Sequence, residues 1–182
     1  MADHFTGIIR IGGQVTAEQW KRMAELEELL VFIDPETKQK TESAPPLYDG
    51  EVYMSEGAIA VDDPQAGGGM FFNLENYLVE QGIPFDRFSS ADYGYDAMEA
   101  SFRVGMEKPL ECISTTDGDV TVLVSTVLKV FGDGKAMDDL SEEDLDDLGY
   151  GWRLAMLRQE QPLPEFEYYP LGDEVASPYL RG

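Results

Sequence analysis

Hydrophobic and polar residues follow two different periods between Phe71 and Gly105, and the rest of the chain can be organised around this segment. Phe71, Leu74 and Leu78 recur at helical spacing, which predicts a helix that buries one face. Gly82 stands where a helix C-cap favours a positive φ, and the proline two residues later cannot continue the helix. The chain is therefore predicted to turn back here in extended form.

From Met98 to Val104, apolar residues alternate with Glu99, Ser101 and Arg103. A period of two predicts a half-buried strand. Similar short runs rich in β-branched and aromatic residues, bounded by turn residues, predict further strands at 7–15, 52–54, 58–61 and 110–116.

Three other segments favour helix. Thr16 and Gln19 have the spacing of a capping box, and the helix that they begin is predicted to run to about Leu30. Residues 120–131 have the β-branched content of a strand, but their apolar positions follow helical spacing, which favours a helix. Residues 152–157 add a further apolar helical turn.

Helices interspersed with antiparallel strands predict an α+β fold, an antiparallel sheet with helices packed on one face. A ferredoxin-like βαββαβ arrangement is one variant that fits the order of elements. We expect residues 1–160 to form one domain that ends in an acidic helical part. Several prolines in 161–182 forbid regular helix, and the Leu, Phe and Tyr residues among them indicate an extended tail packed on the domain.

Charge changes this picture more than any motif does. Thirty-six acidic residues oppose thirteen basic ones, and the formal net charge is −23. Such a chain repels nucleic acid and anionic membranes and attracts the basic surfaces that hold nucleic acid. Solubility or adaptation to salt would explain the same charge without a partner.

The densest acidic stretch runs from Met137 to Leu148. If it is helical throughout, its acids form two neighbouring rows that could resemble the charge spacing of phosphates, Asp138, Glu142 and Asp146 in one row and Asp139, Glu143 and Asp147 in the other. Alternatively, Ser141 caps a shorter helix that begins at Glu142, and the early acids then serve the helix dipole with no partner.

A second candidate contact surface lies between the predicted strands, where acids alternate with tyrosines. Its residues are Asp92, Tyr93, Tyr95 and Asp96. Tyrosine beside a carboxylate can engage an arginine through cation–π contact and ion pairing. An ordinary hairpin loop explains the same residues.

Other classes of function find little support in the sequence. Cys112 is the single cysteine, so an intramolecular disulfide and a cysteine-based zinc site are excluded, and a buried inert thiol is expected. His4 is the single histidine, near the N-terminus. There is no apolar run of about 18 residues and no signal-peptide pattern, so we expect a cytoplasmic protein. No catalytic or cofactor motif stands out in the sequence, so we expect a protein that has no cofactor and is not an enzyme.

The segment from Leu78 to Gly105 resembles a pattern found in small, acidic bacterial and phage proteins that have no established activity. The residues that carry the resemblance are Leu78, Gly82, Ile83, Pro84, Phe85, Asp86, Arg87, Ser89, Tyr95, Phe102, Arg103 and Gly105. In size and charge the chain also resembles the DNA-mimic inhibitors that mobile elements use against CRISPR or restriction systems. That resemblance rests on size and charge alone, so it assigns no functional role to particular residues.

We therefore expect a non-enzymatic binding protein whose acidic surface blocks a nucleic-acid-binding protein, such as a CRISPR effector or a restriction enzyme. Its contacts are predicted to come from the acidic rows and from the Asp92–Asp96 connection. The alternatives are an acidic enzyme or small-molecule binder, or a host adaptor whose charge only keeps it soluble.

Overall fold

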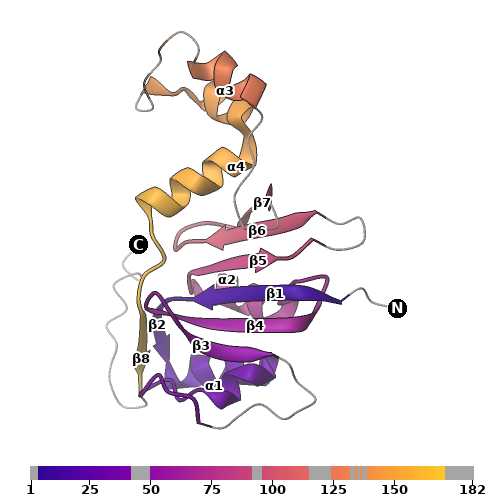
Figure 1. The fold of residues 1–182 in the computed structure, drawn as a ribbon. Helices are drawn as coiled ribbons and strands as arrows, with labels where there is room; N and C mark the ends of the chain where they lie inside the picture. The colour runs from indigo at the N-terminus through magenta and orange to yellow at the C-terminus, as the bar shows by residue number, and fades with distance from the viewer. Residues whose placement is uncertain are drawn as a thin grey trace.

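Six antiparallel strands form the main sheet, in the order β3-β4-β1-β5-β6-β7 (Figure 1). A computed structural model describes residues 4–41, 50–91, 96–114, 124–131, 134, 136 and 139–170. The six strands are β1 His4–Ile11, β3 Glu51–Ser55, β4 Ala58–Gly67, β5 Phe85–Ser89, β6 Ala97–Phe102 and β7 Leu110–Ser114. The predicted α+β fold with an antiparallel sheet is confirmed.

Two crossovers build the centre of this sheet. Helix α1 (Ala17–Leu26) connects β1 to β3, and helix α2 (Phe72–Gln81) connects β4 to β5. The two strands that each crossover joins are not neighbours in the sheet: β4 lies between β1 and β3, and β1 lies between β4 and β5. This is the split βαββαβ arrangement. The ferredoxin-like variant thus describes the first six main elements, and β6 and β7 extend the sheet past β5.

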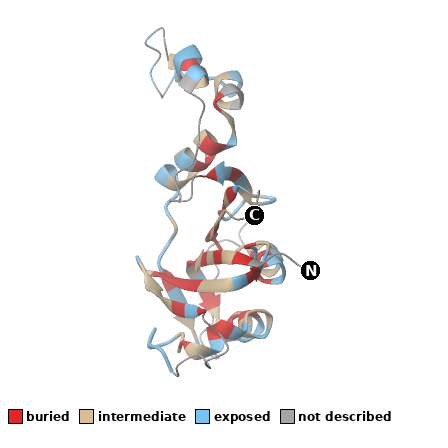
Figure 2. Ribbon diagram, turned by 45° about the vertical axis from the view of Figure 1, so that its right-hand side comes forward, coloured by how far each residue is buried: buried red, intermediate tan, exposed pale blue. Residues whose placement is uncertain are grey.

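Helices α1 and α2 pack on the same face of the sheet, and the main core lies between them and the strands (Figures 1 and 2). The largest fully buried apolar side chains here are Ile9, Ile11, Met23, Leu29, Leu30, Ile59, Leu74, Leu78, Phe85, Phe102 and Phe166. They come from segments spread between residues 9 and 166, so this core is built from long-range contacts.

Local signals set most helix ends. The capping box is present: Thr16 Oγ1 accepts from the Gln19 amide, and the Gln19 side chain accepts from the Thr16 amide. Helix α2 ends at Gly82, whose φ of 67° is left-handed, as predicted. The prediction that α1 continues to Leu30 is wrong, because α1 ends at Leu26 and a separate 3₁₀ helix, η1 (Glu28–Phe32), follows.

The strands predicted at 52–54 and 58–61 are confirmed as β3 and β4, and they pair as a hairpin with its turn at Glu56 and Gly57. Strand β4 is longer than expected and continues through Pro64 to Gly67. Its pairing with β1 shifts register opposite Phe5 and Gly7, because a proline cannot donate to a regular ladder.

Two further helices lie beyond β7, at the end of the molecule away from α1: α3 (Val124–Phe131) and α4 (Glu142–Glu160) (Figure 1). The helical prediction is confirmed over 124–131, and residues 120–123 lie outside the described part. Gly149 has a φ of 78° and divides α4 at a kink into a first segment, 142–148, and a second segment, 150–160. The first segment and α3 form a small lobe, and Phe131 of α3 packs against Trp152, near the start of the second segment, with ring centroids 5.5 Å apart.

The second segment of α4 lies against β7 and β6, on the sheet face opposite α1 and α2. The prediction that Met98 to Val104 is half-buried is therefore wrong. Glu99, Ser101 and Arg103 are as buried as the apolar residues between them, since α4 and the chain that follows it cover their side.

The extended tail is confirmed as far as the structure describes it. Strand β8 (Phe166–Tyr169) pairs in parallel with β2 (Gly13–Thr16), and residues 171–182 lie outside the described part. Among the described residues, no helix is long and apolar enough to cross a membrane.

Glu27, between α1 and η1, gives the fold a pH dependence that can be measured. Burial raises the pKa of its carboxyl to about 7, from 4.5, and the nearby charges of Asp63 and Glu28 act in the same direction. The folded chain thus keeps a proton that the unfolded chain loses, and this stabilisation disappears as the pH rises from 4.5 to about 7. We expect the urea midpoint to fall between pH 5 and pH 8 and to fall less in Glu27→Gln. An equal fall in both proteins would mean that Glu27 is not the group responsible.

Candidate functional site

The acidic stretch is not one continuous helix. Ser141 is the N-cap of α4: its hydroxyl accepts from the Asp144 amide, and the Asp144 carboxylate accepts from the Ser141 amide at 2.7 Å. The helix therefore begins at Glu142, as in the alternative with a short capped helix. The two acidic rows do not extend back to Asp139, since the capping box stops the helix and early acids favour its N-terminus.

The predicted contact residues that the structure describes with their side chains lie in two separate parts of the molecule. Asp139, Glu142 and Glu143 are exposed on the lobe, and Asp96 is exposed at the start of β6. Asp138, Asp92, Tyr93 and Tyr95 lie outside the described residues, and of Asp146 and Asp147 only the backbone in α4 is described. The structure thus neither unites nor separates the full predicted set.

A buried ion network that the sequence analysis missed runs through the sheet. On the face covered by α2, Arg87 of β5 is almost inaccessible, with Nε 3.1 Å from Glu75 Oε1 and Nη2 2.9 Å from Glu111 Oε1. The same Glu75 oxygen accepts from the Phe71 amide at the start of α2. Arg87 therefore ties α2 to β5 and β7.

On the other face, Asp86 and Glu99 hold two more arginines. Arg103 donates to both oxygens of Asp86, at 2.9 and 3.2 Å, a bidentate pair. Arg158 of α4 donates through Nε to Ser101 Oγ at 2.9 Å and through Nη1 to Glu99 Oε2. Ser101 in turn donates to Asp86. These contacts hold the second segment of α4 on the sheet.

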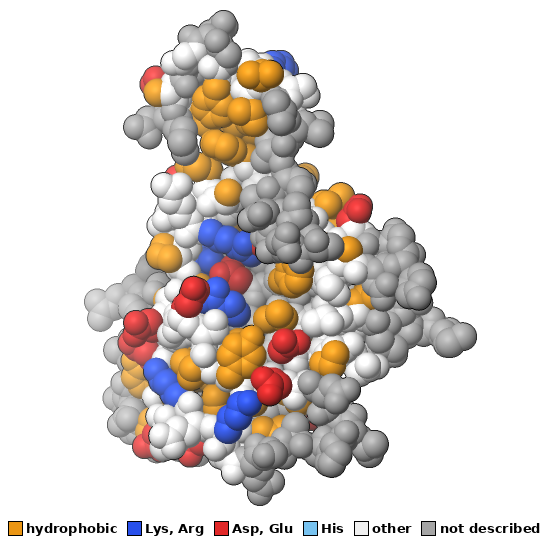
Figure 3. Space-filling model, viewed as in Figure 1, with side chains coloured by type: hydrophobic (Ala, Val, Ile, Leu, Met, Phe, Trp, Pro, Cys, Tyr) orange, Lys and Arg blue, Asp and Glu red, His pale blue; other side chains and the backbone are white. Residues whose placement is uncertain are grey.

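This network nearly neutralises itself, so the excess negative charge lies elsewhere, on the surface. Exposed acids occur on α1, α2, β3, β7, α4 and the segment before β8. They are not confined to the lobe. In Figure 3, the open part of the sheet face is turned toward the viewer, and Lys, Arg, Asp and Glu side chains lie together on it.

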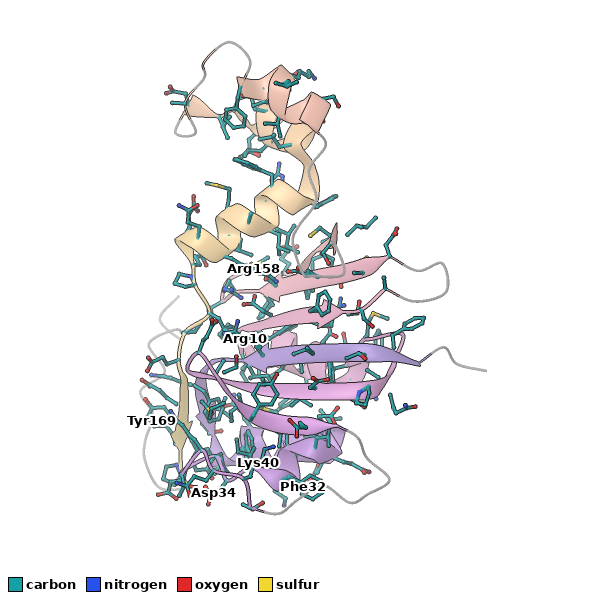
Figure 4. All side chains as sticks on the ribbon, viewed as in Figure 1. Arg10, Phe32, Asp34, Lys40, Arg158 and Tyr169 are labelled. Atoms are coloured by element: carbon teal, nitrogen blue, oxygen red, sulfur yellow. The ribbon has the colours of Figure 1, made fainter. Side chains whose placement is uncertain are left out.

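That open face holds a cavity of about 230 Å³ beside the ion network, lined by Ile8, Arg10, Asp86, Arg87, Phe88, Glu99 and Arg158. Figure 4 shows Arg10 of β1 and Arg158 of α4 on the same side of the sheet. Arg10 also pairs with Glu56 at 2.7 Å. Apolar and ionised side chains therefore share one small concave site.

A larger groove of about 770 Å³ lies between the end of α2, the β2–β8 pair and the turn after β6. Its charged lining residues are Glu80, Glu165 and Glu167, and no Lys or Arg is among the described residues that line it. Gln14 and Tyr169 donate to Glu167 from either side, at 3.3 and 2.7 Å. The groove therefore favours cationic groups.

Cys112 and metal chemistry add no further site. Burial, and next the charge of Glu99, raise the pKa of the Cys112 thiol to about 11, so it is a poor nucleophile at neutral pH. Within the described ranges, no three His, Cys, Asp or Glu side chains converge as metal ligands would.

A signal for the buried network was present in the sequence. Arg87 shares the core face of β5 with Phe85 and Ser89, and a buried face is an unusual place for a charge. Asp86, Arg87 and Arg103 are also among the residues of the pattern singled out between Leu78 and Gly105. That pattern coincides here with residues that hold the sheet together.

Comparisons with protein family models, with curated proteins and with solved structures found no match for this chain.

Proposed function

We propose that this protein is an acidic inhibitor that occupies a Lys/Arg-lined nucleic-acid site on another protein, of the kind directed against CRISPR effectors or restriction enzymes. The observation that carries the proposal is charge segregation. The least accessible arginines are neutralised inside the network, and the acidic excess faces solvent. A surface of this kind is attracted to basic grooves and repelled by nucleic acid itself.

The lobe of α3 and the first segment of α4 is the contact surface that this proposal favours. Asp139, Glu142, Glu143 and Leu128 are exposed there, Leu128 at 65% of its full area, and Tyr150, directly after Gly149, is exposed at 67%. Hydrophobic side chains gather on this lobe in Figure 3. Apolar anchors bordered by charges are typical of specific protein interfaces.

Exposed acids also lie outside the lobe, so the lobe does not account for the whole negative surface charge. Exposed acids on α1, α2, β3 and β7 would accelerate encounter with a basic partner. Close contacts at the lobe would then select one orientation. The acidic groove near β8 is a second surface that a basic side chain could enter.

A charge-reversal pair tests the lobe directly. We expect Glu142→Lys/Glu143→Lys to weaken binding about tenfold or more, because charge pairs in close contact contribute more than distant ones. The measurement is displacement of a fluorescent DNA duplex from a purified Cas9–guide RNA complex and from a purified type II restriction endonuclease, followed by anisotropy. The displacement should weaken as salt increases.

The matched control is Glu18→Lys/Glu36→Lys, which changes the net charge equally at exposed positions of α1 and of the turn after η1, away from the lobe and the acidic groove. Only a small loss is expected from this control. Equal losses in both variants would mean that net charge, and not the lobe, drives binding. If the unaltered protein displaces DNA from neither enzyme, the proposal fails for both classes of partner.

A further inference from the structure

The cavity on the open sheet face contains polar atoms that the fold leaves without a partner. Glu99 is 3% exposed, and its Oε1 has no hydrogen-bond partner among the described residues, whereas its Oε2 is held by Arg158. Arg10 Nε is buried and equally unpartnered. A buried polar group without a partner is costly, and such groups are rare in folded proteins.

The two unpartnered atoms require opposite chemistry. Glu99 Oε1 accepts, so it calls for an N–H donor, and a cationic donor satisfies it best. Arg10 Nε donates, so it calls for an oxygen acceptor. The side chains of Arg10 and Arg158 are each about 30% exposed, at 28% and 31%, so guanidinium groups remain reachable from solvent.

Two other charged residues line the cavity. Arg87 is paired with Glu75 and Glu111 on the core face of the sheet, although its Nη1 has no hydrogen-bond partner among the described residues, and Asp86 is already satisfied. Asp86 accepts from Arg103 through both oxygens and also from Ser101. It therefore contributes little further capacity for a ligand. The apolar part of the lining comes from Ile8 and Phe88, which are neighbours across β1 and β5.

We propose that this cavity binds a small zwitterion, a free α-amino acid with an apolar side chain. Its carboxylate would lie against Arg10 and Arg158, its ammonium group against Glu99, and its side chain on Ile8 and Phe88. The volume of about 230 Å³ is below the range of about 300–1,000 Å³ typical of sites for drug-sized ligands, which suits a ligand of this size.

The charges argue against simpler ligands. A plain anion would satisfy the arginines but leave Glu99 Oε1 unpartnered, and a plain cation would face both arginines. The Debye length of about 8 Å at physiological salt screens most of the −23 net charge, so the local groups decide. This site shares no residue with the lobe, so the proposal stands or falls separately from the proposed inhibitor function.

The test compares three matched probes by calorimetry and by two-dimensional NMR of the whole chain: L-leucine, N-acetyl-L-leucine without the ammonium group, and L-leucinamide without the carboxylate. We expect L-leucine to bind about tenfold or more tighter than either of the other two, because each lacks one charge-assisted contact. The NMR shifts should map to β1, β5 and β6.

Two variants locate the site. Arg10→Gln, a partly exposed position, and Glu99→Gln should each weaken L-leucine binding about tenfold, whereas Arg22→Gln on α1 should leave it unchanged. If Glu99→Gln does not fold, as circular dichroism would show, Arg10→Gln alone decides. The proposal is overturned if L-leucine, L-valine and L-methionine all fail to bind at about 10 mM. Equal binding of N-acetyl-L-leucine, or unaltered binding by Arg10→Gln, would overturn it too.

Discussion

Replacing Phe166 by alanine should lower the free energy of unfolding by about 3–5 kcal/mol. Phe166 is fully buried, and its ring packs edge-on against Trp20 with centroids 5.8 Å apart. Its strand, β8, is held by parallel pairing with β2, and Lys38 Nζ donates to the Phe166 carbonyl at 2.8 Å. A truncated ring would leave a cavity beside α1 and weaken the attachment of β8. Chemical denaturation followed by tryptophan fluorescence and circular dichroism measures the change.

Glu167→Ala is the control, because the next side chain along β8 is exposed and should change stability by about 0.5 kcal/mol or less. A loss below about 1 kcal/mol in Phe166→Ala would contradict the placement of β8 in the core. Segment 162–170 would then be an appendage, and α1 would have to be covered by something else.

Features determined by neighbouring residues were predictable. The capping box at Thr16, the left-handed Gly82 and the β3–β4 turn each depend on a few adjacent side chains. The order of elements then sufficed for the α+β fold, because a split βαββαβ arrangement follows from alternating crossovers and hairpins.

Features determined by distant residues were not predictable. The alternation from Met98 to Val104 predicts a strand with one face exposed to solvent. Glu99 and Ser101 are nevertheless buried, because Arg158, nearly sixty residues later in the chain, covers them. No local pattern reports such a contact. The continuation of β4 past Pro64 likewise depends on its partner strand, which absorbs the irregularity as a shift in register.

The candidate contact surface illustrates the same division. Both interpretations of the acidic stretch were available from the sequence, and the local capping box of Ser141 decided between them. The cavity beside Glu99 could not be predicted, since it requires β1, β5, β6 and α4 to meet. The lobe variants test whether the acids near Glu142 contact a basic partner, as proposed.

Replacing Arg87 by methionine should be as damaging as the loss of Phe166, with a cost of about 3–5 kcal/mol. Methionine keeps the apolar length of the side chain but removes the guanidinium between Glu75 and Glu111. Glu75 has only 11% of its side chain exposed, so its carboxylate would become a buried charge without its cation. Glu111 is about half exposed and can turn to water. The penalty should therefore come mainly from Glu75, measured as a lower midpoint of urea unfolding.

A double variant separates the lost ion pair from lost packing. In Arg87→Met/Glu75→Gln, the amide is neutral and its oxygen can still accept from the Phe71 amide, so most of the stability should return. Arg22→Met, which breaks an exposed pair with Glu25, is the surface control and should cost about 0.5 kcal/mol or less. If the double variant is no more stable than Arg87→Met, the arginine acts through the shape of its side chain. The network in the sheet would then be a consequence of the packing around α2 and not a cause of it.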